Sequence, residues 1–296
     1  MSVKLFRKTI RALGFAALLA AAVLVSARGV RADSGWVERG GKYYYQNAGG
    51  KYVTGVRKIG KSYYYFNKNG VLRTRFGWQK AGKRTCYVMP DSTLAVGVQK
   101  IGRDTYIFGK NGAMRNGSVR VGTRVWYLTD DGKAEAYKEG KTYYYANGKK
   151  MSRVDAYDYE TFQTAKRIAA RITNDGMSKA QKLRRCFNWV MKKYYITKRK
   201  FTSAPGWIPL YANDHFHGKG GTCLSDAAAF GYLAKAVGYK NVYACLDSPR
   251  AGGHAWTEIN GRVYDPLFAQ AKSYSKYYGA TYKSYRLSPS VRVRMS

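Results

Sequence analysis

A short motif recurs through the first half of the chain, and this recurrence restricts the possible folds more than any other feature. Each copy starts with glycine and runs into one to three aromatic residues, and successive copies begin 18 to 22 residues apart. The copies are Gly41-Lys-Tyr-Tyr-Tyr45, Gly60-Lys-Ser-Tyr-Tyr-Tyr65, Gly82-Lys-Arg-Thr-Cys-Tyr87, Gly102-Arg-Asp-Thr-Tyr106, Gly122-Thr-Arg-Val-Trp-Tyr127 and Gly140-Lys-Thr-Tyr-Tyr-Tyr145. A repeat with a nearly constant period predicts stacked supersecondary units rather than one globular core.

Turn residues divide each copy into shorter segments. A second glycine turn follows the aromatic stretch, for example at Asn69-Gly70 and Asn111-Gly112. Asn-Gly and Asp-Gly tolerate the positive φ of tight turns, so each copy is predicted to form a β-hairpin. One hairpin alone is marginally stable in water, whereas stacked hairpins bury their aromatic faces. We therefore predict an all-β hairpin-repeat solenoid over residues 33–150.

The repeats resemble the choline-binding or glucan-binding repeats of Gram-positive surface proteins, which attach to the cell wall. In that family a Gly-Trp pair often opens a unit and contributes to an aromatic cage, and here Gly35-Trp36 and Gly77-Trp78 supply such a pair. The resemblance implies a cell-wall polymer or glycan as partner. Packing between hairpins is the alternative role for any one aromatic residue. The aromatic residues expected at the wall ligand are Trp36, Tyr44, Tyr64, Trp78 and Trp126.

The first residues have the layout of a secretory signal. Basic residues from Lys4 to Arg11 precede a thirteen-residue apolar run, Leu13 to Val25, and small residues follow. As a helix this run would rise about 20 Å, short of the ~30 Å hydrocarbon core of a bilayer. We predict a signal peptide over residues 1–32, a protein secreted to the cell wall or cell surface, and no permanent membrane span. Cleavage after Ala27 and cleavage after Ala32 both fit.

The net charge favours anionic partners. The chain has 53 basic and 17 acidic residues, a formal charge of +36. Residues 1–32 contain six basic and no acidic residues, so the remainder keeps +30. Wall polymers or anionic lipid headgroups are the expected partners outside the cell, and a solvated basic face with no dedicated partner is the alternative. Nucleic acid is not expected there, although charge and tyrosines alone would permit it.

From Met151 the pattern changes to helical periodicity followed by short strands. Apolar residues predict a helix over Tyr159–Thr173, ending near Asn174-Asp175-Gly176. Ser178 is a predicted cap for a second helix. Its apolar stripe is Leu183, Cys186, Phe187, Val190, Met191 and Tyr194. We predict a separate domain over residues 151–296.

A glycine-rich segment leads into a helix that begins at Cys223. Thr222 is the predicted N-cap, which places the thiol in the first turn and leads to a helix ending near Gly238. The positive helix end favours the thiolate, the form that attacks carbonyls, by about 0.3–1 kcal/mol. This is less than the ~1.36 kcal/mol that one pKa unit represents. A further group must therefore activate the sulfur.

Strands are predicted after this helix over Val242–Leu246, Gly253–Ile259 and Arg262–Leu267. Asn260-Gly261 joins the last two as a two-residue hairpin loop. This turn pairs Ile259 with Arg262, Trp256 with Asp265 and His254 with Leu267. His254 and Asp265 then share one face as diagonal neighbours about 7–8 Å apart. The hairpin thus offers an imidazole and a carboxylate that could orient it.

Three motifs resemble those of the transglutaminase-like superfamily: Gly-Gly-Thr-Cys223-Leu-Ser-Asp-Ala, Gly-Gly-His254-Ala-Trp and Val-Tyr-Asp265-Pro-Leu. The resemblance implies a Cys223–His254–Asp265 triad on an α+β, papain-like core at the C-terminal end. It implies no cofactor and a protein or peptide substrate. Members of this superfamily include cross-linkers, deamidases and peptidases, which share a thioester intermediate. The alternative is a non-catalytic surface adhesin or glycan-binding protein with a degenerate enzyme fold.

The remaining cysteine and histidine residues give weaker signals. If Cys223 stays free, at most one disulfide can form among Cys86, Cys186 and Cys245. Cys186 lies on the helical stripe and is expected in the core. His215 and His217 suggest a metal site with His254, but no fourth ligand is visible, so no metal is expected.

Overall fold

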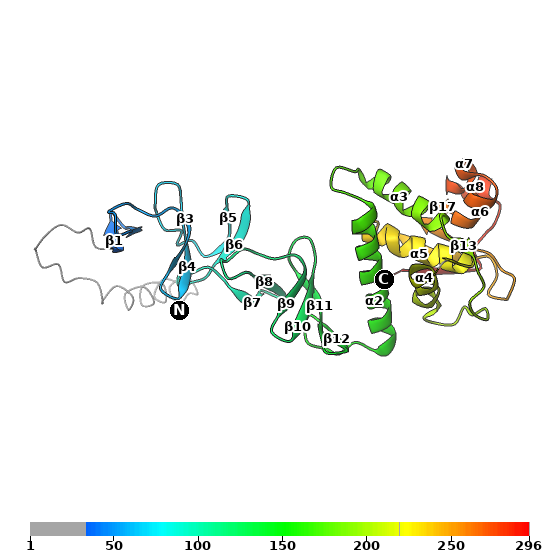
Figure 1. The fold of residues 1–296 in the computed structure, drawn as a ribbon, viewed down its shortest axis with the longest axis horizontal. Coiled ribbons are helices and arrows are strands. Elements are labelled where there is room, and N and C mark those ends of the chain that lie inside the picture. The colour runs from blue at the N-terminus through cyan, green and yellow to red at the C-terminus, as the bar shows by residue number, and fades with distance from the viewer. Residues whose placement is uncertain (1–33, 219, 296) are drawn as a thin grey trace, which may run out of the picture. The chain divides into compact units, whose positions relative to one another are not determined.

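The structure, a computed structural model, describes residues 34–218 and 220–295 (Figure 1). The predicted signal peptide, residues 1–32, lies outside these residues. The chain divides between Lys150 and Met151 into two compact units. Within the described residues, no helix is both long and apolar enough to cross a membrane.

The N-terminal unit consists of successive antiparallel β-hairpins, which confirms the predicted hairpin repeats. The last two hairpins join in one four-stranded sheet of order β12-β11-β10-β9. The paired strands are β1(Gly35–Arg39) with β2(Lys42–Gln46), β3(Gly55–Ile59) with β4(Ser62–Phe66), β5(Gly77–Ala81) with β6(Arg84–Val88), β7(Gly97–Ile101) with β8(Asp104–Phe108), β9(Gly117–Val121) with β10(Arg124–Leu128), and β11(Ala134–Glu139) with β12(Thr142–Tyr145).

The hairpin turn lies at the first glycine of each copy, not at the Asn-Gly dipeptide. Gly60 has φ +60° between β3 and β4, where Ile59 pairs with Ser62. Asn69-Gly70 instead forms the turn that leaves β4, and Asn67 Oδ1 accepts the Asn69 N–H there at 2.9 Å. The predicted hairpins are therefore correct, whereas the role assigned to the second turn was wrong.

Backbone hydrogen bonds tie each hairpin to the one before it. The Leu72 N–H donates to Tyr43 O at 2.7 Å, and the Leu94 N–H donates to Tyr63 O at 2.7 Å. At the equivalent turn, Gly112 has φ +72°, and a Cβ there would lie 2.8 Å from the Leu94 side chain. Because neighbouring hairpins approach this closely, glycine is required in the connecting turn.

The C-terminal unit contains helices and an antiparallel sheet of order β18-β17-β16-β15-β19. The helices are α2(Arg153–Ile172), α3(Lys179–Met191), α4(Trp207–His217), α5(Cys223–Ala236), α6(Pro266–Ala271), α7(Tyr274–Tyr277) and α8(Tyr282–Tyr285). The sheet strands are β15(Val242–Leu246), β16(Ala255–Ile259), β17(Arg262–Tyr264), β18(Tyr278–Ala280) and β19(Val291–Arg294). A two-residue parallel pair joins β13(Tyr194–Tyr195) to β14(Gly220–Gly221).

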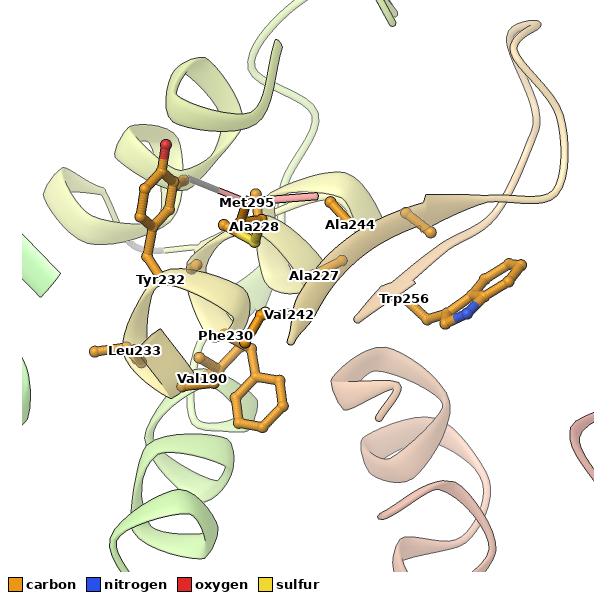
Figure 2. Packing of buried hydrophobic residues seen from close by; sticks show 14 of the residues in the cluster. Val190, Ala227, Ala228, Phe230, Tyr232, Leu233, Val242, Ala244, Trp256 and Met295 are labelled. Atoms are coloured by element: carbon orange, nitrogen blue, oxygen red, sulfur yellow. The ribbon is translucent and has the colours of Figure 1, made fainter. Parts of the chain in front are cut away.

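Helix α5 is the centre of this unit. Its residues from Cys223 to Ala234 are all buried, between the sheet and helices α2, α3 and α4. Small side chains such as Ala227 and Ala228 allow the helix to lie close to the sheet, in the same core as Ala244 (Figure 2). The Thr257 hydroxyl donates to Ala227 O at 2.7 Å and fixes β16 against the helix.

The two predicted helices form, with different limits. Helix α2 begins at Arg153 rather than at Tyr159, because Ser152 accepts the Asp155 N–H as its N-cap. Helix α3 has the predicted Ser178 cap, completed into a capping box by Gln181. Tyr194 does not belong to the apolar stripe, since the helix ends before it and its side chain is 73% exposed.

The third predicted strand is too long. It ends at Tyr264, because Pro266 opens helix α6 and Asp265 is the N-cap of that helix. The predicted pairs beyond Tyr264 therefore do not form, whereas the Ile259–Arg262 pair does. The β15 limits are as predicted.

All four cysteines are free and buried. The single disulfide that the sequence left open among Cys86, Cys186 and Cys245 does not form in the described part of the chain. Cys186 is fully buried in the core of the C-terminal unit, which confirms its expected packing role.

Candidate active site

The nucleophile candidate lies at the start of helix α5. Thr222 is the N-cap residue, as predicted, so Cys223 opens the first turn. The Thr222 hydroxyl makes no capping hydrogen bond. The extended backbone of Thr222 marks the start of the helix instead. The Cys223 side chain is 7% exposed, and its Sγ lies 3.9 Å from Gly253 O. The thiol thus faces the segment that carries His254.

The two glycines before this cysteine are required by close backbone contacts. A Cβ on Gly220 would lie 1.8 Å from Tyr194 O, and a Cβ on Gly221 would lie 2.2 Å from Ser225 Cβ. The Ile196 N–H donates to Gly221 O at 3.0 Å, which continues the β13–β14 pairing. The glycine-rich segment therefore holds the start of α5 in place.

His254 and Asp265 meet at the open end of the β16–β17 hairpin. His254 Nε2 and Asp265 Oδ2 are 2.7 Å apart. The His254 backbone N–H donates to Asp247 Oδ1 at 2.6 Å. The imidazole also stacks on Phe268, with ring centroids 3.9 Å apart and planes 11° apart. The ring is therefore fixed by a carboxylate, a backbone contact and an aromatic face.

Asp265 is fully buried and fully hydrogen-bonded. Its Oδ1 accepts the Phe268 N–H at 3.0 Å, which caps helix α6. Its Oδ2 accepts the Tyr285 hydroxyl at 2.8 Å in addition to the His254 ring. Burial, followed by the charge of Asp265, raises the pKa of Tyr285 well above its usual range, so this hydroxyl keeps its proton and donates.

The surroundings of His254 favour a protonated ring. Burial lowers its pKa, but the hydrogen bonds to Asp265 and Cys223 outweigh burial and raise the pKa from 6.5 to about 9. Since Nε2 is taken by Asp265, Nδ1 is the nitrogen left for the thiol. A cation beside Cys223 stabilises a thiolate, the activating effect that the helix end alone is too weak to supply.

A second histidine–carboxylate pair lies behind the nucleophile. His215 is fully buried, and its Nδ1 lies 2.9 Å from Asp226 Oδ1 in the first turn of α5. Burial raises the pKa of Asp226, and His215 partly opposes this shift. His217, by contrast, is exposed. In the described part of the chain, no three His, Cys, Asp or Glu side chains are grouped to hold a metal ion.

Two of the predicted wall-ligand aromatics form matching clusters in the repeats. Trp36 lies 5.4 Å from Tyr45 and 5.0 Å from Tyr64 between ring centroids. Forty-two residues later, Trp78 lies 5.1 Å from Tyr87 and 4.9 Å from Tyr106, also edge to face. The Trp78 side chain is 41% exposed, so the second cluster presents an open aromatic surface.

The other predicted aromatics have different surroundings. Tyr44 stacks on Tyr52 with centroids 4.6 Å apart. Trp126 is 5% exposed and packs on Tyr137, an arrangement that favours a packing role. Tyr64 is buried as well, although it borders the Trp36 cluster. Their assignment to the wall ligand stays a prediction.

Comparison with solved structures finds similarity to choline-binding proteins. Choline-binding protein F of Streptococcus pneumoniae is 25% identical over 40% of this chain and 45% of its own, with a TM-score of 0.32. The choline-binding domain of Spr1274 from the same organism is 30% identical over 29% of this chain and its whole length, with a TM-score of 0.25. The cell-wall endolysin of phage Cp-1, solved with choline, is 23% identical over 44% of this chain and 41% of its own, with a TM-score of 0.29.

The chain spans less than half the length of the first of these proteins. No protein-family model matches this chain, and no curated protein matches it.

Proposed function

We propose that the C-terminal unit is a thiol enzyme that acts on amide or peptide carbonyls through a Cys223 thioester. The observation that supports this proposal is the meeting of three side chains from separate segments: a thiol at a helix start, a ring whose pKa is raised to about 9, and a buried carboxylate bound to that ring. Nucleophile, base and orienting acid are the parts that covalent catalysis needs.

In the first half of the reaction, the Cys223 thiolate attacks the carbonyl carbon of the substrate. The C–N bond breaks, and His254 gives its proton to the departing nitrogen, so that ammonia or an amine leaves and a thioester remains. Asp265 stabilises the charged ring and fixes its orientation throughout. Tyr285 donates a hydrogen bond to Asp265 and helps to hold it in place.

In the second half, His254 is neutral and takes a proton from the acceptor. If the acceptor is water, the thioester is hydrolysed to a carboxylic acid. If it is an amine, a new amide forms and the two molecules are cross-linked. Both routes regenerate the thiolate and the protonated ring. We favour hydrolysis or an unspecified acyl transfer, because cross-linking requires water to be excluded from the thioester.

The papain-like core and the transglutaminase-like activity implied by the sequence motifs belong to this proposal. Two features of the C-terminal unit support them. The candidate nucleophile opens a buried helix, and this helix packs against an antiparallel sheet whose β16–β17 hairpin ends at His254 and Asp265.

Alkylation tests the role of Cys223. Iodoacetamide at neutral pH is expected to modify Cys223 in the whole chain, and Cys223→Ala should remove this modification. Cys245→Ala is the matched control, because burial raises the pKa of Cys245 to about 12 and makes its thiol inert. Modification of Cys223→Ala at the wild-type rate would contradict the assignment.

Product analysis tests the reaction. The wild-type chain is incubated with a glutamine peptide, with and without lysine, and the masses of the products are measured. Loss of ammonia, ligation and cleavage give different masses and identify a deamidase, a cross-linker or a peptidase.

We also propose that the repeats attach the protein to the cell wall outside the cell. The exposed Trp78 cluster supports a cationic headgroup on the wall polymer. The formal charge of +30 that remains without residues 1–32 supports an anionic polymer backbone. Trp78→Ala in the whole chain should reduce retention on purified walls, with Tyr194→Ala, another exposed aromatic, as the control. Choline is the first competitor to add. Equal retention of both variants and the wild type would argue against the cluster.

A non-catalytic surface-binding protein is the second candidate. The low exposure of Cys223, 7%, favours it, because a substrate carbonyl must reach this sulfur. Wall retention without any iodoacetamide reaction at Cys223 and without product from glutamine peptides would support this candidate over the enzyme.

A further inference from the structure

We infer that a basic groove between α2 and α3 binds phosphate groups of an anionic polymer. The groove has a volume of about 380 Å³, which is within the ~300–1,000 Å³ range of ligand sites. It belongs to the C-terminal unit and includes no residue of the proposed catalytic site. Its lining residues are Arg171, Ile172, Arg185, Asn188, Trp189 and Lys192.

The helical spacing of α3 brings one side of the groove together. Arg185, Asn188, Trp189 and Lys192 are separated by three or four residues and therefore share one face. Arg171, in the last turn of α2, contributes from the opposite side. The Arg185 Nε–H donates to Ile172 O at 3.3 Å. This hydrogen bond holds the guanidinium across the groove between α3 and α2.

The three cations of the groove have no acidic partner. Among the described residues, no carboxylate lies within ion-pair distance of Arg171, Arg185 or Lys192, whereas Arg199 pairs with Asp214 at 2.5 Å elsewhere in the unit. Arg171 and Lys192 lie at the C-terminal ends of α2 and α3, whose partial negative charge stabilises each cation by only about 0.3–1 kcal/mol. Three like charges around one hollow repel one another, and an anion in the hollow would relieve this repulsion.

Phosphate fits these donors better than a single carboxylate. Guanidinium groups bind phosphate oxygens through paired hydrogen bonds, a lysine adds a point charge, and the Asn188 amide can donate as well. One phosphodiester neutralises only one of the three charges, so several successive anionic groups are needed to fill the groove. Arg185 and Lys192 are seven residues apart, about 10 Å along the helix. A chain of successive phosphodiesters can therefore contact both ends of the groove.

The test measures binding of a short single-stranded phosphodiester oligomer without bases to the whole chain at several salt concentrations. The groove variant combines Arg171→Gln, Arg185→Gln and Lys192→Gln. The matched control combines Lys240→Gln, Arg262→Gln and Lys283→Gln, three exposed cations of the same unit that do not line the groove. Both variants lose the same formal charge, so the comparison isolates position from net charge. Melting temperatures without oligomer show whether each variant is folded.

Each phosphate contact contributes about 0.7 to the slope of log K against log salt for a single strand. The groove variant lacks three such contacts, so the magnitude of its slope should be smaller by about 2. Between 50 and 200 mM salt its affinity should therefore fall about 20-fold less than that of the wild type. The control should change the slope by less than half as much. Equal changes of the slope in both variants would show that only the net charge matters, and would overturn the groove site.

Two further probes decide the ligand chemistry. Poly-glutamate should bind at least tenfold more weakly than the oligomer, and equal binding that depends on the groove would assign the site to carboxylates instead. An oligomer with bases should bind no more tightly than the abasic one, and a strong preference for bases would point to nucleic-acid recognition. If the triple variant does not fold, Lys192→Gln alone should lower the slope by about 0.7, and an unchanged slope overturns the proposal.

Discussion

Replacing Asp265 by asparagine should separate the electrostatic role of this residue from its structural role. Asp265 both orients His254 and caps helix α6. Asparagine is as good an N-cap as aspartate, so Asp265→Asn should leave α6 in place. It removes the negative charge beside the ring and replaces the hydrogen bond to a carboxylate, the largest of the effects that raise the pKa of His254, with a hydrogen bond to a neutral amide.

The size of the expected effect follows from the pKa shift of the His254 ring. The pKa of His254 is about 9, against an ordinary value of 6.5. This difference corresponds to about 3 kcal/mol at ~1.36 kcal/mol per pKa unit. At pH 7.5 a group with a pKa near 9 is more than about 95% protonated, and one with a pKa near 6.5 is about 10% protonated. Because Cys223 also raises the pKa of the ring, loss of the Asp265 charge should lower the protonated fraction of His254 without reversing the whole shift.

The assay is NMR titration of isotope-labelled histidine rings. The chain has three histidines, and His254→Gln identifies the signal of His254. In the wild type this signal should titrate near pH 9, and in Asp265→Asn it should titrate several tenths of a pH unit or more lower. Because the proposed reaction requires protonated His254, turnover should fall as the pH rises through the pKa of this ring. A wild-type ring that titrates near 6.5, or no change in the variant, would refute the proposed electrostatics.

Three other predictions use the surroundings of the site and of the sheet. Tyr285→Phe should lower the free energy of unfolding in urea by about 1–3 kcal/mol, because a buried Asp265 oxygen loses a donor. Gly221→Ala should slow alkylation of Cys223 at least tenfold, since the new Cβ would lie 2.2 Å from Ser225, while Gly176→Ala, whose Cβ would make only a 3.4 Å contact with Asn174, does not. Arg292, then Tyr282, hold the pKa of Glu258 below 4.5 against burial. This contribution to the free energy of unfolding is therefore present above pH 4.5 and lost below it, which acid unfolding of Glu258→Gln would check by showing a weaker pH dependence.

Local signals in the sequence predicted the elements that depend on neighbouring residues. Ser178 predicted the start of α3, and Asn260-Gly261 predicted the Ile259–Arg262 pair. The hairpin repeats were predicted for the same reason, since glycine turns recur at a fixed spacing.

The end of β17 shows where local patterns failed. The strand predicted over Arg262–Leu267 runs through Asp265-Pro266. Proline at the first helical position and aspartate before it are also a helix start, and the structure has that helix. The cap and the proline therefore end the strand, although the strand pattern before them continues.

The support of the candidate site could not be predicted from spacing. Tyr285 reaches Asp265 from 20 residues away, and Asp226 meets His215 from the preceding helix. Neither contact has a sequence signal, because both depend on how helices pack in three dimensions. Sequence spacing placed His254 and Asp265 on one face, and resemblance added Cys223, but the polar groups around them came only from the structure.

The two proposed activities can be lost independently, because each unit has its own hydrophobic core. Phe66, Val88 and Phe108 belong to clusters within the repeats, whereas Phe187 and Phe230 belong to the core around α5. A substitution that removes the Cys223 sulfur deletes no contact in the repeats. Wall retention by a Cys223→Ala chain would therefore give no evidence for or against the chemistry. Only the sulfur itself, tested by alkylation and by product, decides whether the C-terminal unit is an enzyme.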